Sequence, residues 1–194
     1  MSRIPKILFT GTFETGKSTL LNLFADDPRV LIIPETPRDL LKDNPALEVD
    51  PRFQDMIFEE QMKRELAAEE KAQKEGRRAI LCDRGIVDII AYSQVFDYEL
   101  QDLWVEAAQE RYDLGIIFSA TDIPNYTNIP ELGLDMKEYR TNIEVRVRTV
   151  LKDFGIPCVD LFGSIPQRKE TVSLLIDEKI AFIEGSKNFL ERRG

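Results

Sequence analysis

The chain of 194 residues contains no histidine and only two cysteines, Cys82 and Cys158. Without an imidazole there is no histidine to act as general base, phospho-acceptor or zinc ligand, and two separated cysteines cannot form a zinc site alone. Any proton transfer therefore falls to a carboxylate, a lysine or a tyrosine, and a carboxylate is the best candidate. Both cysteines lie in apolar runs, which predicts two free buried thiols rather than a disulfide and suits a reducing cytosol.

Positive charge and long apolar runs are also scarce. There are 26 Lys and Arg against 35 Asp and Glu, a net charge of −9, which argues against nucleic acid as the main partner because phosphate backbones require clustered cations. No apolar run approaches the roughly 18 residues that cross a bilayer, so no membrane partner is expected. The first apolar strand begins close to Met1, which predicts no signal peptide and a cytoplasmic protein. A length of 194 residues with 43% hydrophobic residues predicts one globular domain, residues 1–194.

The most informative motif directly follows the apolar run 7–9. It matches the pattern G-x-x-x-x-G-K-[ST] and consists of Gly11, Thr12, Phe13, Glu14, Thr15, Gly16, Lys17 and Ser18. Backbone N–H groups of such a loop point at one concavity, and the helix expected to follow it adds partial positive charge, so the loop binds a polyphosphate. In this pattern Lys17 pairs with the β- and γ-phosphates, the Ser18 hydroxyl ligates Mg²⁺, and Thr19 adjoins the site. We therefore predict a nucleotide site with ATP and Mg²⁺ as cofactors, with GTP left open.

Four further apolar runs predict buried parallel strands, at 30–33, 79–82, 115–118 and 157–161. Helical patterns separate them, at 51–75 behind the Asp50-Pro51 start signal, after Gly85, and at 98–111, 139–154 and from Ser164. On the helix at 51–75, Glu65 and other charged residues are expected to face solvent. The alternation predicts an α/β protein with the three-layer P-loop NTPase fold, a five-stranded parallel doubly wound sheet with helices on both faces. The polar stretch 120–137 is too long for an ordinary loop, and we interpret residues 120–140 as a lid segment.

Other short signatures give the chain a resemblance to P-loop small-molecule kinases. Residues 83–94, DRGIVDIIAYSQ, resemble a thymidylate kinase signature, and residues 34–38, PETPR, resemble the Pro-Glu segment of deoxynucleoside kinases. The whole layout is most similar to the AAA-like ATPase domain family related to bacterial ribosylnicotinamide kinases. The strand at 79–82 ends in Asp83-Arg84 rather than Asp-Glu. Because a cation stands where such ATPases carry a water-activating carboxylate, this ending favours binding of phosphates or substrate over hydrolysis.

The resemblance implies roles for individual residues. The catalytic set is Lys17, Glu35, Asp83, Arg84 and Arg140, in which Glu35 is the base for the acceptor hydroxyl and Asp83 joins Ser18 at Mg²⁺. The acceptor site consists of Glu35, Arg38, Arg84, Asp88 and Tyr92, with Phe58 and Gln61 as candidate further walls. For Tyr92 a core position is the alternative, and for Phe58 a core position is the preferred interpretation. Ser164 and Arg168 resemble the adenine-side loop, although Ser164 and Gln167 also fit a capping box. For Glu35 and Asp88, a helix-capping role is the alternative, and Arg146 is the alternative to Arg140.

These expectations lead to two hypotheses for function. The first is an ATP- and Mg²⁺-dependent kinase, a transferase acting on the hydroxyl of a small metabolite, namely a nucleoside, riboside or nucleotide. The second is an ATP-binding regulatory module, or slow ATPase, that acts through a protein partner. The expected partner is thus a small-molecule acceptor, and a homodimer is left open.

Overall fold

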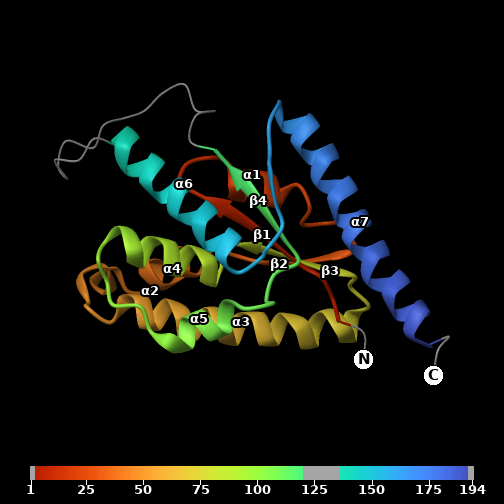
Figure 1. Ribbon diagram of the computed structural model, residues 1–194, viewed down its shortest axis with the longest axis horizontal. Coiled ribbons are helices and arrows are strands. Elements are labelled where there is room, and N and C mark those ends of the chain that lie inside the picture. The colour runs from red at the N-terminus through yellow and green to blue at the C-terminus, as the bar shows by residue number, and fades with distance from the viewer. Residues whose placement is uncertain (1–2, 120–135, 192–194) are drawn as a thin grey trace.

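The computed structural model describes residues 3–119 and 136–191, which form an α/β fold of three layers (Figure 1). A parallel sheet lies in the middle. Its strands are β1 (Lys6–Gly11), β2 (Val30–Ile33), β3 (Ala79–Asp83), β4 (Leu114–Phe118) and β5 (Cys158–Asp160). Across the described residues the sheet has five strands in the order β2-β3-β1-β4-β5, all parallel. The predicted strands and fold class are therefore confirmed.

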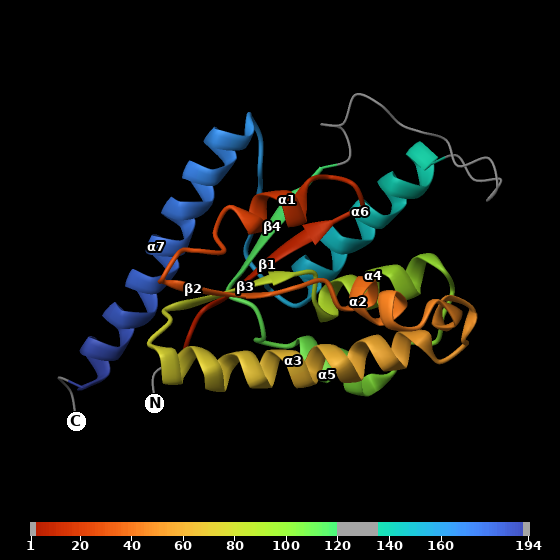
Figure 2. The same ribbon diagram turned by 180° about the vertical axis from the view of Figure 1, so that it is seen from behind.

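The helices cover both faces of this sheet (Figures 1 and 2). They are α1 (Lys17–Asn22), α2 (Thr36–Asp43), the 3₁₀ helix η1 (Pro45–Val49), α3 (Phe53–Glu75), α4 (Ile86–Val95), α5 (Asp102–Ala108), α6 (Met136–Asp153) and α7 (Ile165–Glu191). Alternate residues of β1 point to opposite faces, as the two-residue period of a strand requires. Leu8 packs toward α3, α4, α5 and α6, whereas Ile7 and Phe9 pack toward α1 and α7.

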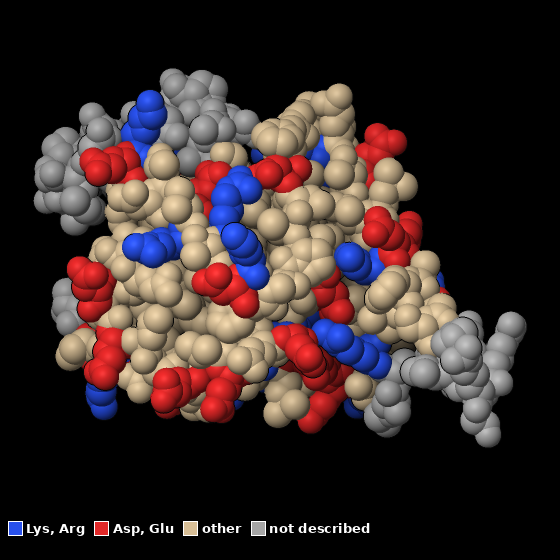
Figure 3. Space-filling model, viewed as in Figure 1, with Lys and Arg blue, Asp and Glu red and all other residues tan. Residues whose placement is uncertain are grey.

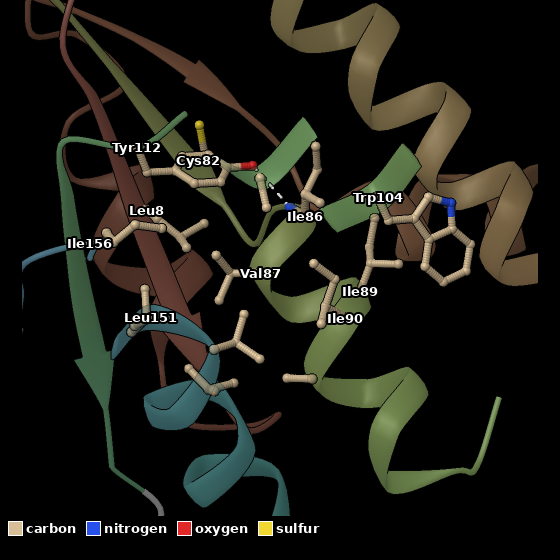
Figure 4. Packing of buried hydrophobic residues seen from close by; sticks show 14 of the residues in the cluster. Leu8, Cys82, Ile86, Val87, Ile89, Ile90, Trp104, Tyr112, Leu151 and Ile156 are labelled. Atoms are coloured by element: carbon tan, nitrogen blue, oxygen red, sulfur yellow. Dashed lines mark hydrogen bonds between the residues drawn. The ribbon is translucent and has the colours of Figure 1, made fainter. Parts of the chain in front are cut away.

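The first of these two cores is dominated by α4, whose apolar residues are buried on nearly every side. Figure 4 shows Ile86, Val87, Ile89 and Ile90 of α4 among residues from the sheet and neighbouring helices. A helix apolar all round is typical of one packed between other elements, and α4 lies against α3, α5 and α6. The start of α4 is consequently held in place, and the residues just before it, Asp83 and Arg84, are held with it.

Two predicted helix boundaries differ from the structure. The helix expected over 98–111 is restricted to α5, because Gln101 before it and Gln109 after it adopt extended conformations with ψ of 134° and 132°. The helix predicted to follow Asp50-Pro51 begins at Phe53, and the Asp50 side chain instead accepts the N–H of Arg52 (2.8 Å) in the preceding turn. Its predicted end at Gly76 is confirmed, with φ of 70°.

Two expectations about burial were wrong. Cys82 is buried but Cys158 is exposed, because β5 is the edge strand of the sheet. Glu65, expected to face solvent, has a fully buried side chain that pairs with Lys6 and Arg111. The lid prediction falls largely on residues 120–135, which lie outside the described residues, while residues 136–140 belong to the first turns of α6 rather than to a loop.

Figure 3 shows how charged side chains are distributed over one face of the molecule. On the face drawn in Figure 3, the Lys and Arg side chains are interspersed with Asp and Glu and form no continuous basic patch. Over residues 3–119 and 136–191, no helix combines the length and apolar character that crossing a membrane requires.

Candidate functional site

The loop that connects β1 to α1 has the backbone shape of a phosphate-binding loop. Gly11 and Gly16 have positive φ values of 119° and 86°, a conformation that glycine adopts without steric cost. At Gly11 a Cβ atom would lie 2.6 Å from the backbone oxygen of Phe118 in β4, so no larger residue fits there. The loop lines a cavity of 230 Å³ together with Glu35, Arg38 and Arg84.

Lys17 occupies the centre of this loop and is 5% exposed. Its ammonium group donates to the backbone oxygen of Thr12 and, at 3.1 Å, to the Thr15 hydroxyl. Burial, together with the nearby Arg84 cation, lowers the pKa of Lys17 to about 7. The lysine is thus directed into the loop, where backbone and hydroxyl oxygens accept its hydrogen bonds.

Ser18 and Asp83 meet at the end of β3, where the Ser18 hydroxyl donates to Asp83 Oδ2 (2.5 Å). Burial raises the pKa of Asp83, and Glu35 adds to this, although the Ser18 hydrogen bond opposes it. The second oxygen of Asp83, Oδ1, is buried and has no hydrogen-bond partner among the described residues. A hydroxyl beside a carboxylate with a free buried oxygen is the donor set that Mg²⁺ takes next to phosphates. The described residues contain no cluster of three or more acidic or cysteine ligands, so the remaining ligands would come from nucleotide and water.

Glu35 and Arg84 form the centre of the site. Arg84 Nε donates to Glu35 Oε1 (2.7 Å), and Arg38 pairs with the other oxygen of Glu35 (2.5 Å). Arg38 also donates to the Ser18 hydroxyl (3.2 Å). Glu35 stands at the N-cap position of α2 but its side chain makes no capping hydrogen bond. Its carboxylate is therefore directed to the arginines rather than to the helix, which removes the capping alternative for this residue.

Arg84 is held from several sides. Its φ is 69°, its Nη1 donates to the backbone oxygen of Gly11 (2.9 Å) and to Asp88 Oδ1 (3.3 Å), and its guanidinium lies 5.0 Å from the centre of the Tyr92 ring. Asp88 both accepts the N–H of Gly85 as a helix cap (3.1 Å) and accepts the Thr10 hydroxyl (2.9 Å). Burial raises the pKa of Asp88 despite these donors. The guanidinium is thus fixed between two carboxylates, and the capping role considered for Asp88 is present. Its role toward an acceptor stays a prediction.

A larger cavity of 430 Å³ lies on the other side of Glu35 and Arg84. Its walls come from the P-loop, α2, η1, α3 and α4, and the lining residues are Phe13, Glu35, Pro37, Leu41, Glu48, Phe53, Gln54, Ile57, Gln61, Arg84, Gly85, Asp88, Ile89 and Tyr92. Gln61, Asp88 and Tyr92 line this cavity, and Phe58 belongs to the core, which was the preferred interpretation for that residue. The contribution of η1 was missed, since nothing in the sequence around Glu48 marks it as a site.

Arg140 lies beside the P-loop. It is 1% exposed, it pairs with the Glu14 carboxylate, and its guanidinium stacks over the Phe13 ring at 4.5 Å from the ring centre. Arg140, expected at the end of the lid segment, therefore contacts the loop directly from α6. Arg146 is exposed on α6, and Arg148 pairs with Glu144 (2.8 Å) and with Asp160. Of these arginines, Arg140 is the one that contacts the loop in the described structure.

Ser164 and Arg168 lie apart from this cluster, at the start of α7. The amide oxygen of Gln167 accepts both the N–H (2.9 Å) and the hydroxyl (2.8 Å) of Ser164, while Arg168 Nε donates to the backbone oxygen of Gly163 (2.8 Å). The capping interaction considered for Ser164 and Gln167 is therefore present. Their role toward a nucleotide base stays a prediction.

Comparison with known proteins identifies what this arrangement is similar to. A family model described as an AAA domain matches residues 6–168. No curated protein matches the sequence significantly. A solved structure of NadR protein in complex with NAD and AMP-PNP is 16% identical with a TM-score of 0.65, over 90% of this chain and 49% of the NadR chain, so this chain spans about half the NadR length.

Two shorter kinases also share the fold. Thymidylate kinase from Ehrlichia chaffeensis is 16% identical with a TM-score of 0.52, over 88% of this chain and 97% of the kinase. Deoxyadenosine kinase from M. mycoides with bound dCTP is 17% identical with a TM-score of 0.52, over 89% of this chain and 99% of the kinase. At these identities the likeness concerns the fold.

Proposed function

The chain belongs to the AAA domain family whose model matches residues 6–168, and from this premise we propose that it is an ATP- and Mg²⁺-dependent kinase. Its acceptor is the hydroxyl of a small metabolite, a nucleoside or another riboside. The family confirms the resemblance noted in the sequence, and the similar structures include a thymidylate kinase and a deoxyadenosine kinase. The substrate, the cytoplasmic location and homodimerisation remain predictions.

The observation that carries this proposal is the pair of cavities that share a wall. The P-loop cavity and the larger cavity are both lined by Phe13, Glu35 and Arg84. A phosphate held in the first cavity therefore lies next to a group held in the second, with a carboxylate and a guanidinium between them. This is the arrangement that transfer between two bound molecules requires, because holding both reactants replaces a collision by positioning.

The phosphate side supplies charge and orientation. Lys17 and the backbone N–H groups of the loop bind the triphosphate, and Arg84, which lines the same cavity, neutralises negative charge on the transferring group. Arg140 contacts this loop through Glu14 and Phe13, and we assign it a supporting role in that neutralisation. Ser18 and Asp83 would hold Mg²⁺, which supplies neutralisation of phosphate charge when bound. Because transfer of a phosphoryl group is catalysed mainly by positioning and charge, these residues need no covalent role.

Glu35 is the residue of the shared wall that can take a proton from the acceptor. In the proposed step, the acceptor oxygen forms a bond to the γ-phosphorus of ATP. The bond between the γ-phosphorus and the β–γ bridging oxygen breaks, and ADP leaves with that oxygen. The hydroxyl proton passes to the Glu35 carboxylate, which faces both cavities. In a chain with no histidine, a carboxylate at this place is the available base.

The chemistry of the larger cavity selects the kind of acceptor. Apolar side chains and the amides of Gln54 and Gln61 suit a flat heterocycle. Among the described residues that line it, Arg84 is the one cation, and its charge is paired with Glu35 and Asp88. A phosphorylated acceptor would lie near Glu35, Glu48 and Asp88, and the described part of the lining offers it no further cation. The cavity therefore favours a nucleoside or riboside over a nucleotide.

The direct test is incubation of the protein with ATP, Mg²⁺ and a panel of nucleosides, ribosides and nucleoside monophosphates, read by mass shift. We expect a gain of one phosphoryl group on a nucleoside or riboside and none on the monophosphates. Transfer to monophosphates alone would overturn the acceptor class. ATP binding without phosphorylation of any acceptor in the panel would favour the regulatory module instead.

A further inference from the structure

Glu65 is an acidic residue of the core that connects the two segments carrying Glu35 and Arg84. It lies on α3, one turn after Gln61, and its side chain is 0% exposed. Ionised carboxylates are rarely buried unless they are paired and hydrogen-bonded. Each of its two carboxylate oxygens accepts hydrogen bonds from defined neighbours, so the contacts around Glu65 are well determined.

Each oxygen of Glu65 accepts two hydrogen bonds. Oε1 accepts the Gln61 amide (2.8 Å) and the Tyr112 hydroxyl (2.6 Å). Oε2 accepts Lys6 (3.2 Å) and Arg111 Nε (2.7 Å). Although burial alone would raise it, Lys6 and Arg111 hold the pKa of Glu65 below its usual value. The group is therefore an acceptor only, and every neighbour must present a donor to it.

This requirement fixes the orientation of the Gln61 side chain. With its NH₂ group directed to Glu65, its oxygen faces the other way and accepts the Thr36 hydroxyl (2.6 Å). Thr36 directly follows Glu35, and Gln61 itself lines the larger cavity. An amide can otherwise turn over and exchange its donor and acceptor ends, so Glu65 determines which end the cavity presents.

The second connection runs through Tyr112 to the start of α4. Because the Tyr112 hydroxyl donates to Glu65, it is free to accept the N–H of Ile86 (2.9 Å), the bond drawn in Figure 4. The contact is tight, since a Cβ atom on Gly85 would lie 2.3 Å from this hydroxyl. Gly85 directly follows Arg84 in the chain. The hydroxyl therefore sets the position of the turn that carries the guanidinium.

We propose that Glu65 is a positioning residue of the kinase site, which orients the Gln61 amide toward the acceptor and fixes the turn that carries Arg84. This inference rests on the proposed function. A buried ion pair is weak support for stability, since apolar residues of similar volume often do as well. Here the carboxylate acts by orienting its neighbours, because it connects the segment after β2 to the segment after β3 through hydrogen bonds.

The test compares Glu65→Gln with Glu69→Gln. Glu69 follows Glu65 by one turn of α3 and also pairs with Lys6 (2.6 Å), but among the described residues it bonds neither Gln61 nor Tyr112. Both variants remove one charge from the same cluster, and only the first frees the amide and the hydroxyl. We expect Glu65→Gln to lower kcat/KM for the acceptor about 10- to 100-fold, with the Kd for ATP unchanged, and Glu69→Gln to stay within about 2-fold of wild type.

Folded Glu65→Gln protein with wild-type kcat and acceptor KM would overturn the proposal, because a purely structural role lowers stability without changing either constant. Equal losses in the two variants would overturn it as well, since the effect would then be one of charge alone. If Glu65→Gln does not fold, Tyr112→Phe is the second variant. It keeps the Glu65 carboxylate with its three other donors and removes the hydroxyl that accepts the Ile86 N–H. We expect about a 10-fold loss of kcat there, and an unchanged kcat would contradict the proposal.

A readout independent of catalysis separates this proposal from the proposed function. If the wild-type protein labels no acceptor, the kinase assignment fails, and hydrogen exchange measured by NMR still tests the positioning. The Gln61 side-chain amide and the Ile86 backbone amide should exchange faster in Glu65→Gln than in Glu69→Gln. Equal rates in the two variants would overturn the positioning role.

Discussion

Lys17 is the one lysine among the described residues that line the P-loop cavity. We expect Lys17→Ala to weaken ATP binding about 10- to 100-fold, the loss of a charge-assisted hydrogen bond. The fold should persist, because the ammonium contacts groups of the loop alone among the described residues. Calorimetry with ATP measures the loss, and Lys74→Ala on the exposed surface of α3 is the control. Unchanged affinity in Lys17→Ala would remove the P-loop assignment.

Glu35 is the residue on which transfer, rather than binding, should depend. We expect Glu35→Gln to lower kcat about 10²- to 10⁴-fold, the usual contribution of a positioned acid–base group, while ATP affinity stays near wild type. Glutamine keeps the shape and can still accept from Arg84, which preserves the wall between the cavities. Glu48→Gln is the matched control, since Glu48 lines the acceptor cavity from η1, away from the P-loop cavity. Full turnover by Glu35→Gln would exclude it from the mechanism.

Sequence reasoning could bring Lys17, Glu35 and Asp83 together because all three lie near the ends of strands. Lys17 and Glu35 follow β1 and β2, Asp83 is the last residue of β3, and the carboxyl ends of parallel strands meet in open α/β folds. Their chemical roles stay predictions. The pairs that were missed, Glu14 with Arg140 and Glu65 with Lys6, join segments 126 and 59 residues apart. Such pairings depend on how helices pack, and a charged residue on a helix shows no local sign of whether it faces solvent or the core.

At the level of elements, the start of α4 is the most constrained point near the site. A Cβ atom on Gly85 would meet the Tyr112 hydroxyl at 2.3 Å and Leu8 at 2.9 Å. We therefore expect Gly85→Ala to lower the free energy of unfolding by about 1–3 kcal/mol, the usual cost of overpacking. Gly185→Ala is the control, because that glycine lies on exposed α7 with open space around it and should gain about 0.5–1 kcal/mol. Urea unfolding of both variants checks the difference, and equal stabilities would contradict the constraint.

The strands were predictable because each is a short apolar run between turn residues, and a buried parallel strand needs both faces apolar. The boundaries of α5 were not predictable, because nothing in the sequence marks the extended conformations of Gln101 and Gln109 that bound this helix. The exposure of Cys158 follows from strand order, since within residues 3–119 and 136–191 β5 lies at the edge of the sheet and pairs with β4 alone. Order in a sheet depends on crossovers between distant segments, which apolar runs do not encode.

At the scale of the whole molecule, the pH dependence of stability combines carboxylates whose pKa is raised by folding with one whose pKa is lowered. Burial raises the pKa of Asp83 and Asp88, so ionising them opposes folding and their protonation at lower pH relieves that cost. Lys6 and Arg111 outweigh burial at Glu65 and lower its pKa. Its contribution is therefore fully present above the unfolded pKa of 4.5 and is lost as pH falls through the lower folded value. The pH dependence of the free energy of unfolding of the wild-type protein therefore contains the effect of Asp83 and Asp88 together with the effect of Glu65.

The difference between wild type and Glu65→Gln isolates the second effect, because Asp83 and Asp88 are common to both proteins. At neutral pH we expect the variant to unfold about 3 kcal/mol more easily, since it leaves Lys6 and Arg111 without their shared carboxylate. Below pH 4.5 the gap should narrow, because protonated Glu65 resembles glutamine in charge. Urea unfolding of both proteins at several pH values between about 7 and 3 measures this gap. A gap that stays constant, or widens toward acid, would show that Glu65 is not held ionised by these cations, and the donor-only arrangement around it would lose its basis.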